Sequence, residues 1–302
     1  MSYEIKTLNK KDWPPLLKQI NDPPKTLNYA GQIPDYKRKF LCVVGSRKYT
    51  NYGKEAVSSI VSDLRGFPIT IVSGLALGID SIAHRTAMKN DLSTIAVPGS
   101  GLSPKALHPA THAQLAEEIV DSGGTLLSEY EPDFKATQWS FPLRNRIMAG
   151  MCHATLIVEA EQKSGTMITA KLTTEYNRDL LAIPGNIMSP MSEGPNMFIR
   201  LGATLIRNAD DVLEALGIGK LDLGMERSKD GKIEEKDFNN RYQDCSEREL
   251  IIISLLKEPL EKDELIRKAK ANGLPVSETQ TLLTLLELKG HIIEKMGELR
   301  LT

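Results

Sequence analysis

Two short segments of the sequence combine small residues with groups that can hold an anion. Gly45-Ser46-Arg47 and Ser164-Gly165-Thr166 each follow an apolar run and precede a segment with helical spacing. Backbone N–H groups at the start of a helix attract negative charge, and an arginine adds a planar fork suited to phosphate. A further turn, at Gly74, allows a ligand to approach the backbone closely. These residue types and spacings predict sites for phosphate-type groups.

A third segment pairs cations with aromatic rings. It runs from Trp139 to Arg146 and contains Phe141, Arg144 and Asn145. Cations for backbone phosphates beside rings for stacking bases are typical of proteins that bind single-stranded nucleic acid. This segment therefore favours a single-strand binding site.

Residues with the spacing of a catalytic or metal site are not found in the sequence. It contains no phosphate-loop lysine motif, no HExxH pair and no GxSxG elbow. Asp80 and His84 follow the Gly74 turn, and a structural role is favoured for both without excluding a functional one, since an acidic residue suits a helix start. We predict binding, with no catalytic residue, no metal and no cofactor.

The elements that must position these residues follow from short apolar runs. Such runs end at small residues and alternate with segments of helical spacing, and they occupy residues 40–44, 69–72, 94–97, 125–127, 155–158 and 180–183. Continuous apolar strands joined by helices predict a parallel sheet covered on both faces. The expected fold is a doubly wound, mostly parallel α/β domain, in which ligands bind at the carboxyl ends of the strands.

Composition narrows the class of protein. The 302 residues carry 38 Lys+Arg and 39 Asp+Glu, so net charge alone gives no sign of nucleic-acid binding. The charged start has no secretory signal, and no stretch reaches the about 18 apolar residues of a membrane span. Cys42, Cys152 and Cys245 are scattered, which excludes a disulfide scaffold. A cytoplasmic protein without a membrane segment is expected.

Charge and periodicity divide the chain into four parts. Residues 1–39 form a lead-in segment and residues 40–216 the α/β domain. Residues 217–244 are polar, charged and aperiodic, which predicts a linker. Residues 245–302 show three apolar helical faces followed by a hairpin pattern, which predicts a winged-helix domain.

Taken together, the motifs resemble the DprA/Smf family of DNA-processing proteins. The resemblance covers about Trp13 to Leu216, and the matching stretches are GSR and YG within 45–53, SGLALGID at 73–80, GGTLLSEY at 123–130, FPLRNRIMAG at 141–150, VEAEQKSGTMITA at 158–170, IPGNI at 183–187 and SEGPNMFIRLGATLI at 192–206. Two departures stand out. The first forty residues leave no room for the small helical domain of many members, and His108-Pro109 stands where members often have Tyr-Pro.

The resemblance implies an extended Rossmann-like domain that binds single-stranded DNA, protects incoming strands and helps load the recombinase RecA in natural transformation. It also implies a homodimer, for which the apolar residues of 197–201 and 212–216 offer a surface. Carried onto this sequence, it implies contacts to the strand from one set of residues, namely Gly45, Ser46, Arg47, Gly74, Phe141, Arg144, Asn145, Arg146, Ser164, Gly165 and Thr166.

Two other functions compete with this interpretation. A LOG-like (lysine-decarboxylase-like) nucleotide-cleaving hydrolase shares the core, but residues 163–169 lack a glutamate after the threonine. A winged-helix transcription regulator would need a basic or amide-rich third helix. The polar positions of residues 278–289 carry one Lys against two Glu, so we expect that domain to contact protein or to assist DNA binding only weakly.

Overall fold

The central strand of the fold shows why both faces of the sheet are covered. In β3 (Lys39–Val44), Phe40, Cys42 and Val44 point to one apolar layer, whereas Leu41 and Val43 point to the other. Successive strand residues face opposite sides of a sheet, so a run that is apolar at every position has to be buried on both. The doubly wound domain predicted from these runs is confirmed.

The computed structural model describes residues 3–218, 245–256, 260–295 and 298–301. The chain divides into two compact units, Met1–Met225 and Glu226–Thr302. The predicted linker, residues 217–244, lies outside the described residues from position 219 onward.

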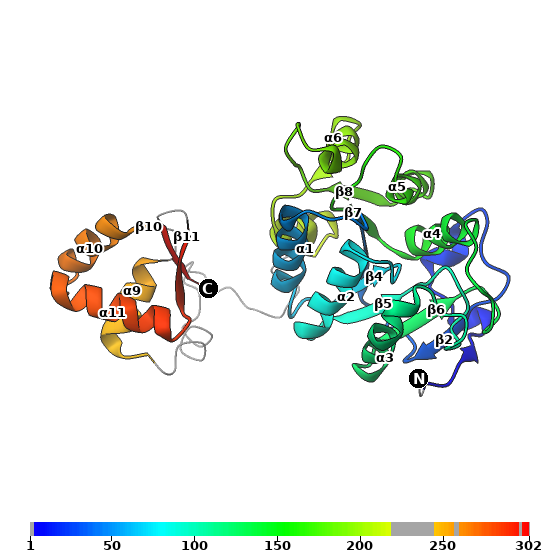
Figure 1. Cartoon of the computed structure of the whole chain (residues 1–302), viewed down its shortest axis with the longest axis horizontal. Helices are drawn as coiled ribbons and strands as arrows, with labels where there is room; N and C mark the ends of the chain where they lie inside the picture. Colours follow the sequence, from blue (N-terminus) through cyan, green and yellow to red (C-terminus); the bar gives the residue numbers. More distant parts are fainter. Residues whose placement is uncertain (1–2, 219–244, 257–259, 296–297, 302) are drawn as a thin grey trace. The chain divides into compact units, whose positions relative to one another are not determined.

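The first unit is built on a nine-stranded sheet with the order β1-β2-β6-β5-β4-β3-β7-β8-β9 (Figure 1). Strands β3 to β9 are parallel, and β2 and β1 extend one edge antiparallel. The chain winds outward from β3 to β6, then crosses back to β7 beside β3, so the strand order reverses between β3 and β7. The strands other than β3 are β1 (Lys6–Thr7), β2 (Asn28–Gly31), β4 (Ile69–Ser73), β5 (Ser93–Ala96), β6 (Thr125–Ser128), β7 (Ala154–Ile157), β8 (Asp179–Ala182) and β9 (Thr204–Leu205).

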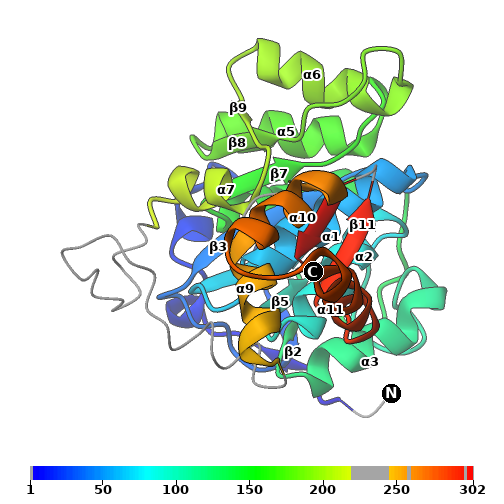
Figure 2. The same ribbon diagram turned by 90° about the vertical axis from the view of Figure 1, so that its left-hand side faces the viewer.

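Helices cover the two faces in separate groups. One face carries α1 (Asn51–Asp63), α2 (Ile79–Lys89) and α7 (Ala209–Ala215). The other carries α4 (Ser140–Met151), α5 (Gly165–Glu175) and α6 (Glu193–Arg200). One further helix, α3 (Ala113–Asp121), packs over β5 and β6. Figure 2 shows α5, α6, β8 and β9 gathered at one end of this unit.

Residues 3–39 belong to the same layers as the rest of the first unit. The short helical turns Lys10–Asp12 and Leu16–Gln19 lead into β2, and Trp13, Leu17 and Leu27 pack into the core beneath α4. The Trp13 indole donates a hydrogen bond to the Leu8 carbonyl, so its polar group stays paired although the ring is buried. This segment therefore supplies one wall of the core and two strands of the sheet.

Part of the apolar surface proposed for self-association is not on the surface. Phe198, Val212, Leu213 and Leu216 are each at most 6% exposed and pack within the two core layers. Sequence periodicity cannot tell a docking surface from the inner face of a helix that covers a sheet. Of the residues in the two proposed ranges, Leu201 stays markedly exposed, at 68%.

The described residues of the second unit form three helices and a small antiparallel sheet of order β10-β12-β11. Ile252, Leu265, Leu286 and Leu299 are among the residues of its separate core. The three helices and the terminal hairpin expected from the sequence are present. The elements are α9 (Glu247–Leu255), β10 (Leu260–Glu261), α10 (Lys262–Ala271), α11 (Val276–Leu288), β11 (Ile292–Lys295) and β12 (Glu298–Leu301).

Within the described ranges of both units, no helix is long and apolar enough to cross a membrane.

Candidate nucleic-acid interface

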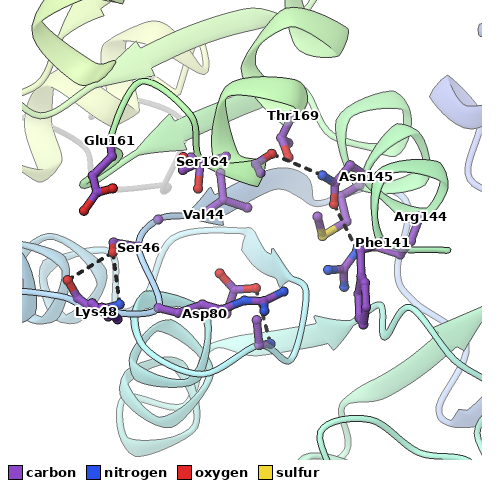
Figure 3. A pocket seen from close by; sticks show the side chains of 16 residues that line it. Val44, Ser46, Lys48, Asp80, Phe141, Arg144, Asn145, Glu161, Ser164 and Thr169 are labelled. Carbon is purple, nitrogen blue, oxygen red and sulfur yellow. Dashed lines mark hydrogen bonds between the residues drawn. The ribbon is translucent and has the colours of Figure 1, made fainter. Parts of the chain in front are cut away.

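A pocket of the first unit lies at the carboxyl ends of β3 and β7, where the strand order reverses. This is the place at which an open α/β sheet offers a crevice between diverging loops. We call it the switch-point pocket. Its volume is about 450 Å³, and it is lined by Val44, Gly45, Ser46, Arg47, Lys48, Ala76, Asp80, Phe141, Arg144, Asn145, Met148, Glu161, Ser164, Gly165, Thr166 and Thr169. Figure 3 shows Ser46 and Lys48 on one side and Phe141 and Asn145 on the other.

Helix α4 presents one face to this pocket. Phe141, Arg144, Asn145 and Met148 all line it, and they stand at positions i, i+3, i+4 and i+7 of the helix. Residues at this spacing share one side of an α-helix. One face of α4 thus brings together a ring, a guanidinium and an amide.

Arg144 is a buried cation that holds the pocket wall together. Its guanidinium donates hydrogen bonds to the Gly74 carbonyl (2.6 Å) and to the Val97 carbonyl, and its side chain is almost inaccessible. The buried Asp80 carboxylate lies on the same side and accepts from the Gly74 N–H at 3.0 Å. Burial raises the pKa of Asp80, and the Arg144 charge opposes that rise. The two groups order the β4–α2 loop beside the pocket.

Two glycines let the loops approach closely enough to form this wall. A Cβ on Gly74 would come within 2.6 Å of both the Arg144 guanidinium and the Asp80 carboxylate. Gly78, with φ +82, would place a Cβ 2.3 Å from the Ser46 carbonyl. Only a residue without a side chain fits at either position.

The exposed rim of the pocket carries a cation and two rings. The Arg47 guanidinium carbon lies 5.6 Å from the centre of the Phe141 ring, within the range of a cation–π contact. Phe141 also meets the exposed His108 ring, with centroids 5.4 Å apart. A smaller adjoining cavity is lined by Gly74 and His108 together with Arg47, Phe141 and Arg144.

The opposite wall is the N-terminus of α5. Ser164 occupies the N-cap position, yet its side chain accepts no hydrogen bond from the helix. Its buried hydroxyl has no partner among the described residues. The Asn145 amide donates to the Gly165 carbonyl at 3.4 Å, which ties this wall to α4. Unused donors at a helix start form a site for an anion.

The structure brings together ten of the eleven residues predicted from the sequence, and Arg146 stands apart. Its guanidinium pairs with the Glu129 carboxylate and lies 3.6 Å from Asp22, with only 11% of the side chain exposed. Arg144 and Arg146 are neighbours in sequence, but two residues along a helix turn the side chain by about 200°. Arg146 therefore points to the N-terminal segment and away from the pocket.

Several lining residues were missed in the sequence. Met148 and Thr169 continue helix faces already marked by Arg144 and Thr166, so their spacing would have identified them. Lys48 and Glu161 lie in loops without periodicity and give no such signal. The charged lining residues are Arg47, Lys48 and Arg144 against Asp80 and Glu161, an excess of one positive charge.

Asp80 and His84 occupy buried positions. His84 is fully buried, its Nδ1 lies 2.7 Å from the Thr94 hydroxyl, and burial lowers its pKa to about 3. An imidazole that stays neutral inside the core is not placed to act on a ligand. Asp80 lines the pocket but is engaged by backbone N–H groups.

Comparison with known proteins gives a consistent result. Residues 4–217 match the sequence profile of the family described as DNA recombination-mediator protein A. The chain is 34% identical over 285 residues to protein Smf of Escherichia coli K12, covering 94% of this chain and 74% of that protein. It is 38% identical over 197 residues to DNA processing protein DprA of Streptococcus pneumoniae, covering 65% of this chain and 68% of the other.

Solved structures agree with this match. The X-ray structure of DprA from Streptococcus pneumoniae superposes with a TM-score of 0.65 at 36% identity, covering 70% of this chain and 74% of that one. A structure of DNA processing protein A from Helicobacter pylori, reported for its single-stranded DNA binding mode, superposes with a TM-score of 0.63 at 30% identity. That match covers 71% of this chain and 96% of the other.

Proposed function

Since this chain belongs to the DNA recombination-mediator protein A family of DNA-processing proteins, we propose that it binds single-stranded DNA across the switch-point pocket. The observation that carries the proposal is the stack of Arg47 on Phe141 at the pocket rim, opposite the N-terminus of α5. A cation, a partly exposed ring and unused backbone donors are the groups that hold a phosphate chain with unpaired bases.

Each wall of the pocket has its own part in this proposal. Arg47 and the α5 N-terminus, with Ser164, Gly165 and Thr166, hold backbone phosphates. The Phe141 ring stacks on a base. Arg144 supports the pocket by fixing the β4–α2 loop, because its guanidinium already donates to backbone carbonyls. Arg146 serves the scaffold, since its charge is matched by Glu129 and Asp22.

Family membership supports a proposal for the wider role. We propose that the chain protects incoming single strands and helps load the recombinase RecA during natural transformation, as a homodimer and in the cytoplasm. The second unit, which we propose to be a winged-helix domain, contacts protein or assists DNA binding weakly. One exposed face of helix α11 supports this, because Thr281, Thr284 and Leu285 on that face carry no charge.

We propose a binding protein and not an enzyme. The alternative, a LOG-like nucleotide-cleaving hydrolase, needs a carboxylate beside the small residues at the α5 start. The carboxylates that line the pocket are Asp80, which is engaged by backbone donors, and Glu161 on the loop before α5. Hydrolysis of a nucleoside monophosphate by the purified protein would revive this alternative.

Fluorescence anisotropy with labelled poly-dT and a matched duplex, each at two salt concentrations, tests the proposal. Binding should favour the single strand and weaken as salt rises, because phosphate contacts release counterions. Mixed sequences without guanine should bind about as well as poly-dT. Equal affinity for duplex and single strand would contradict the proposal.

A further inference from the structure

A second cavity opens beside the switch-point pocket, one strand further along the sheet. Its volume is about 360 Å³, and we call it the β7–β8 cavity. It is lined by Thr50, Tyr52, Glu159, Gly185, Asn186, Ser189 and Ser192. These residues come from the start of α1 and from the loops that follow β7 and β8. The proposal made above for the switch-point pocket gives this cavity no role.

The two cavities share their loops, so one strand of nucleic acid can reach both. Ser46 and Lys48 line the first and Thr50 and Tyr52 the second, within one segment of seven residues. In the loop after β7, Glu161 lines the first cavity and Glu159 lines the second. Neighbouring strand ends lie about 4.8 Å apart, so the cavities are within one or two nucleotides of each other.

The wall of the β7–β8 cavity offers a ring in a fixed position. Tyr52 keeps half of its surface exposed, while its hydroxyl donates to the Pro184 carbonyl. The loop after β8 is itself held, because the Asn196 side chain accepts from the Gly185 N–H (3.1 Å) and donates to its carbonyl (3.0 Å). A ring that is already ordered loses little entropy when a base stacks on it.

The floor of the cavity is a carboxylate and not a cation. Glu159 is 2% exposed and accepts hydrogen bonds from the Thr50 N–H (2.9 Å) and hydroxyl. An ionised carboxylate only accepts hydrogen bonds, and each oxygen has more than one lone pair. It repels phosphate and suits a group that presents N–H donors. Among bases, guanine presents an exocyclic amino group beside an imino N–H.

The loop that supplies Asn186 and Ser189 to the cavity also carries exposed apolar side chains. Ile187 and Met188, between these two residues in the chain, are 86% and 84% exposed, more than the other exposed large hydrophobic residues of the described ranges. A nucleobase has an apolar plane and a polar edge. Exposed apolar groups suit its plane, and the polar floor of the cavity suits its edge.

From these observations we propose that the β7–β8 cavity is a nucleobase subsite of the single-strand path, with a preference for guanine. Tyr52 stacks on the base, Glu159 accepts from its N–H edge and the 186–188 loop closes over it. This inference rests on the proposed function, because it takes the strand to be held first in the switch-point pocket.

Two oligonucleotide lengths and one matched pair of variants test the subsite. Tyr52→Leu should weaken anisotropy binding of a twelve-residue dT strand about fivefold or more, as expected for one lost stacking contact. It should leave the binding of a single labelled dT nucleotide, which is too short to reach from the switch-point pocket to the cavity, within about twofold of the wild type. Tyr49→Leu is the control, because Tyr49 is 42% exposed against 50% for Tyr52 but does not line the cavity.

Base preference is tested by moving one dG through the twelve-residue dT strand. Affinity should rise about fivefold at a single position, as for one well-placed base contact, and Glu159→Gln should remove the gain. Because Glu159 also holds the start of α1, Asn186→Ala is measured as well, and both variants are checked by thermal melting.

The outcomes separate this inference from the proposed function. If Arg47→Ala weakens binding while Tyr52→Leu does not, the subsite is wrong and the single-strand proposal stands. If guanosine monophosphate binds but no dG position gains affinity, the cavity holds a free nucleotide and the subsite proposal is overturned. If wild-type protein binds no single strand at all, both fail.

Discussion

At the residue scale, the direction of a side chain on its helix decides between binding and scaffolding. Arg144 and Arg146 lie in one basic segment of the sequence, and composition alone assigns both to the same surface. In the structure Arg144 lines the pocket, whereas Arg146 is paired with Glu129 and Asp22. Charged residues that are neighbours in the sequence of a helix therefore need to be assigned to helix faces, at about 100° per residue, before they are given roles.

Arg47 is the exposed cation from which we expect a measurable phosphate contact. Arg47→Ala should weaken single-strand binding at low salt and flatten the slope of log affinity against log salt by about 0.7, the value for one phosphate contact to a single strand. Poly-dT and mixed sequences should lose affinity alike, because phosphate contacts carry no sequence information. Anisotropy titrations at four salt concentrations measure the slope, and an unchanged slope would remove Arg47 from the strand.

Arg146→Ala should instead leave the salt slope unchanged and lower stability. Removing the guanidinium leaves the Glu129 carboxylate nearly buried without its partner, which costs about 3 kcal/mol of unfolding free energy. Urea denaturation at pH 8 measures the loss. A smaller loss is expected when the same change is made in a Glu129→Gln background.

The cost of Arg146→Ala should also depend on pH. Burial already raises the pKa of Glu129 against the opposing charge of Arg146, and the variant raises it further. Between the ordinary carboxyl pKa and that raised value, the folded state binds more protons than the unfolded state. Stability then increases as pH falls. The deficit should be largest at pH 8 and smaller at pH 5, and a deficit that grows on acidification would contradict this assignment.

At the scale of elements, the six apolar runs predicted β3 to β8, because β3 to β7 are buried along almost their whole length. The parallel strand β9, whose two residues are exposed, was not predicted. The antiparallel edge was not predicted. β1 has two residues and β2 four, too few to show a period of two. The β7–β8 cavity was not predicted either, since its residues come from the start of α1 and from two loops that meet only through the strand order.

A substitution at the start of helix α5 tests whether a phosphate of the single strand approaches the helix backbone, and it leaves the fold intact. Gly165 is its first residue, and a Cβ built there meets nothing within 4 Å. Gly165→Ala should keep or slightly raise the melting temperature, since alanine favours a helix over glycine. It should weaken single-strand binding about fivefold if a phosphate sits against this N-terminus.

Thr174→Ala is the matched control for Gly165→Ala, because Thr174 is exposed on α5 and does not line the pocket. Melting curves and anisotropy on the same preparations make the comparison. Unchanged binding by Gly165→Ala would show that the strand does not approach the α5 backbone.

At the scale of the whole molecule, the switch-point pocket belongs to one of the two units. The residues that line the switch-point pocket lie between Val44 and Thr169, within the first unit. The second unit has its own core, and the start of α9 is fixed locally. There the Ser246 hydroxyl and the Glu249 carboxylate cap each other's backbone, and Lys289 pairs with Glu249 at 2.8 Å. Each unit therefore has what it needs to fold by itself.

A chain ending at residue 218 should accordingly bind single strands with an affinity within about twofold of the full protein. Its slope of log affinity against log salt should differ by less than about 0.7, the value for one phosphate contact. The reason is that the proposed phosphate and stacking groups all remain, while the exposed α11 residues that are lost include the neutral Thr284 and Leu288. Anisotropy at several salt concentrations compares the two proteins, and a melting curve confirms that the short one is folded. A tenfold loss of affinity with a flatter slope would instead assign strand contacts to cations of the second unit, with Arg267 and Lys270, both exposed on α10, the first to be replaced.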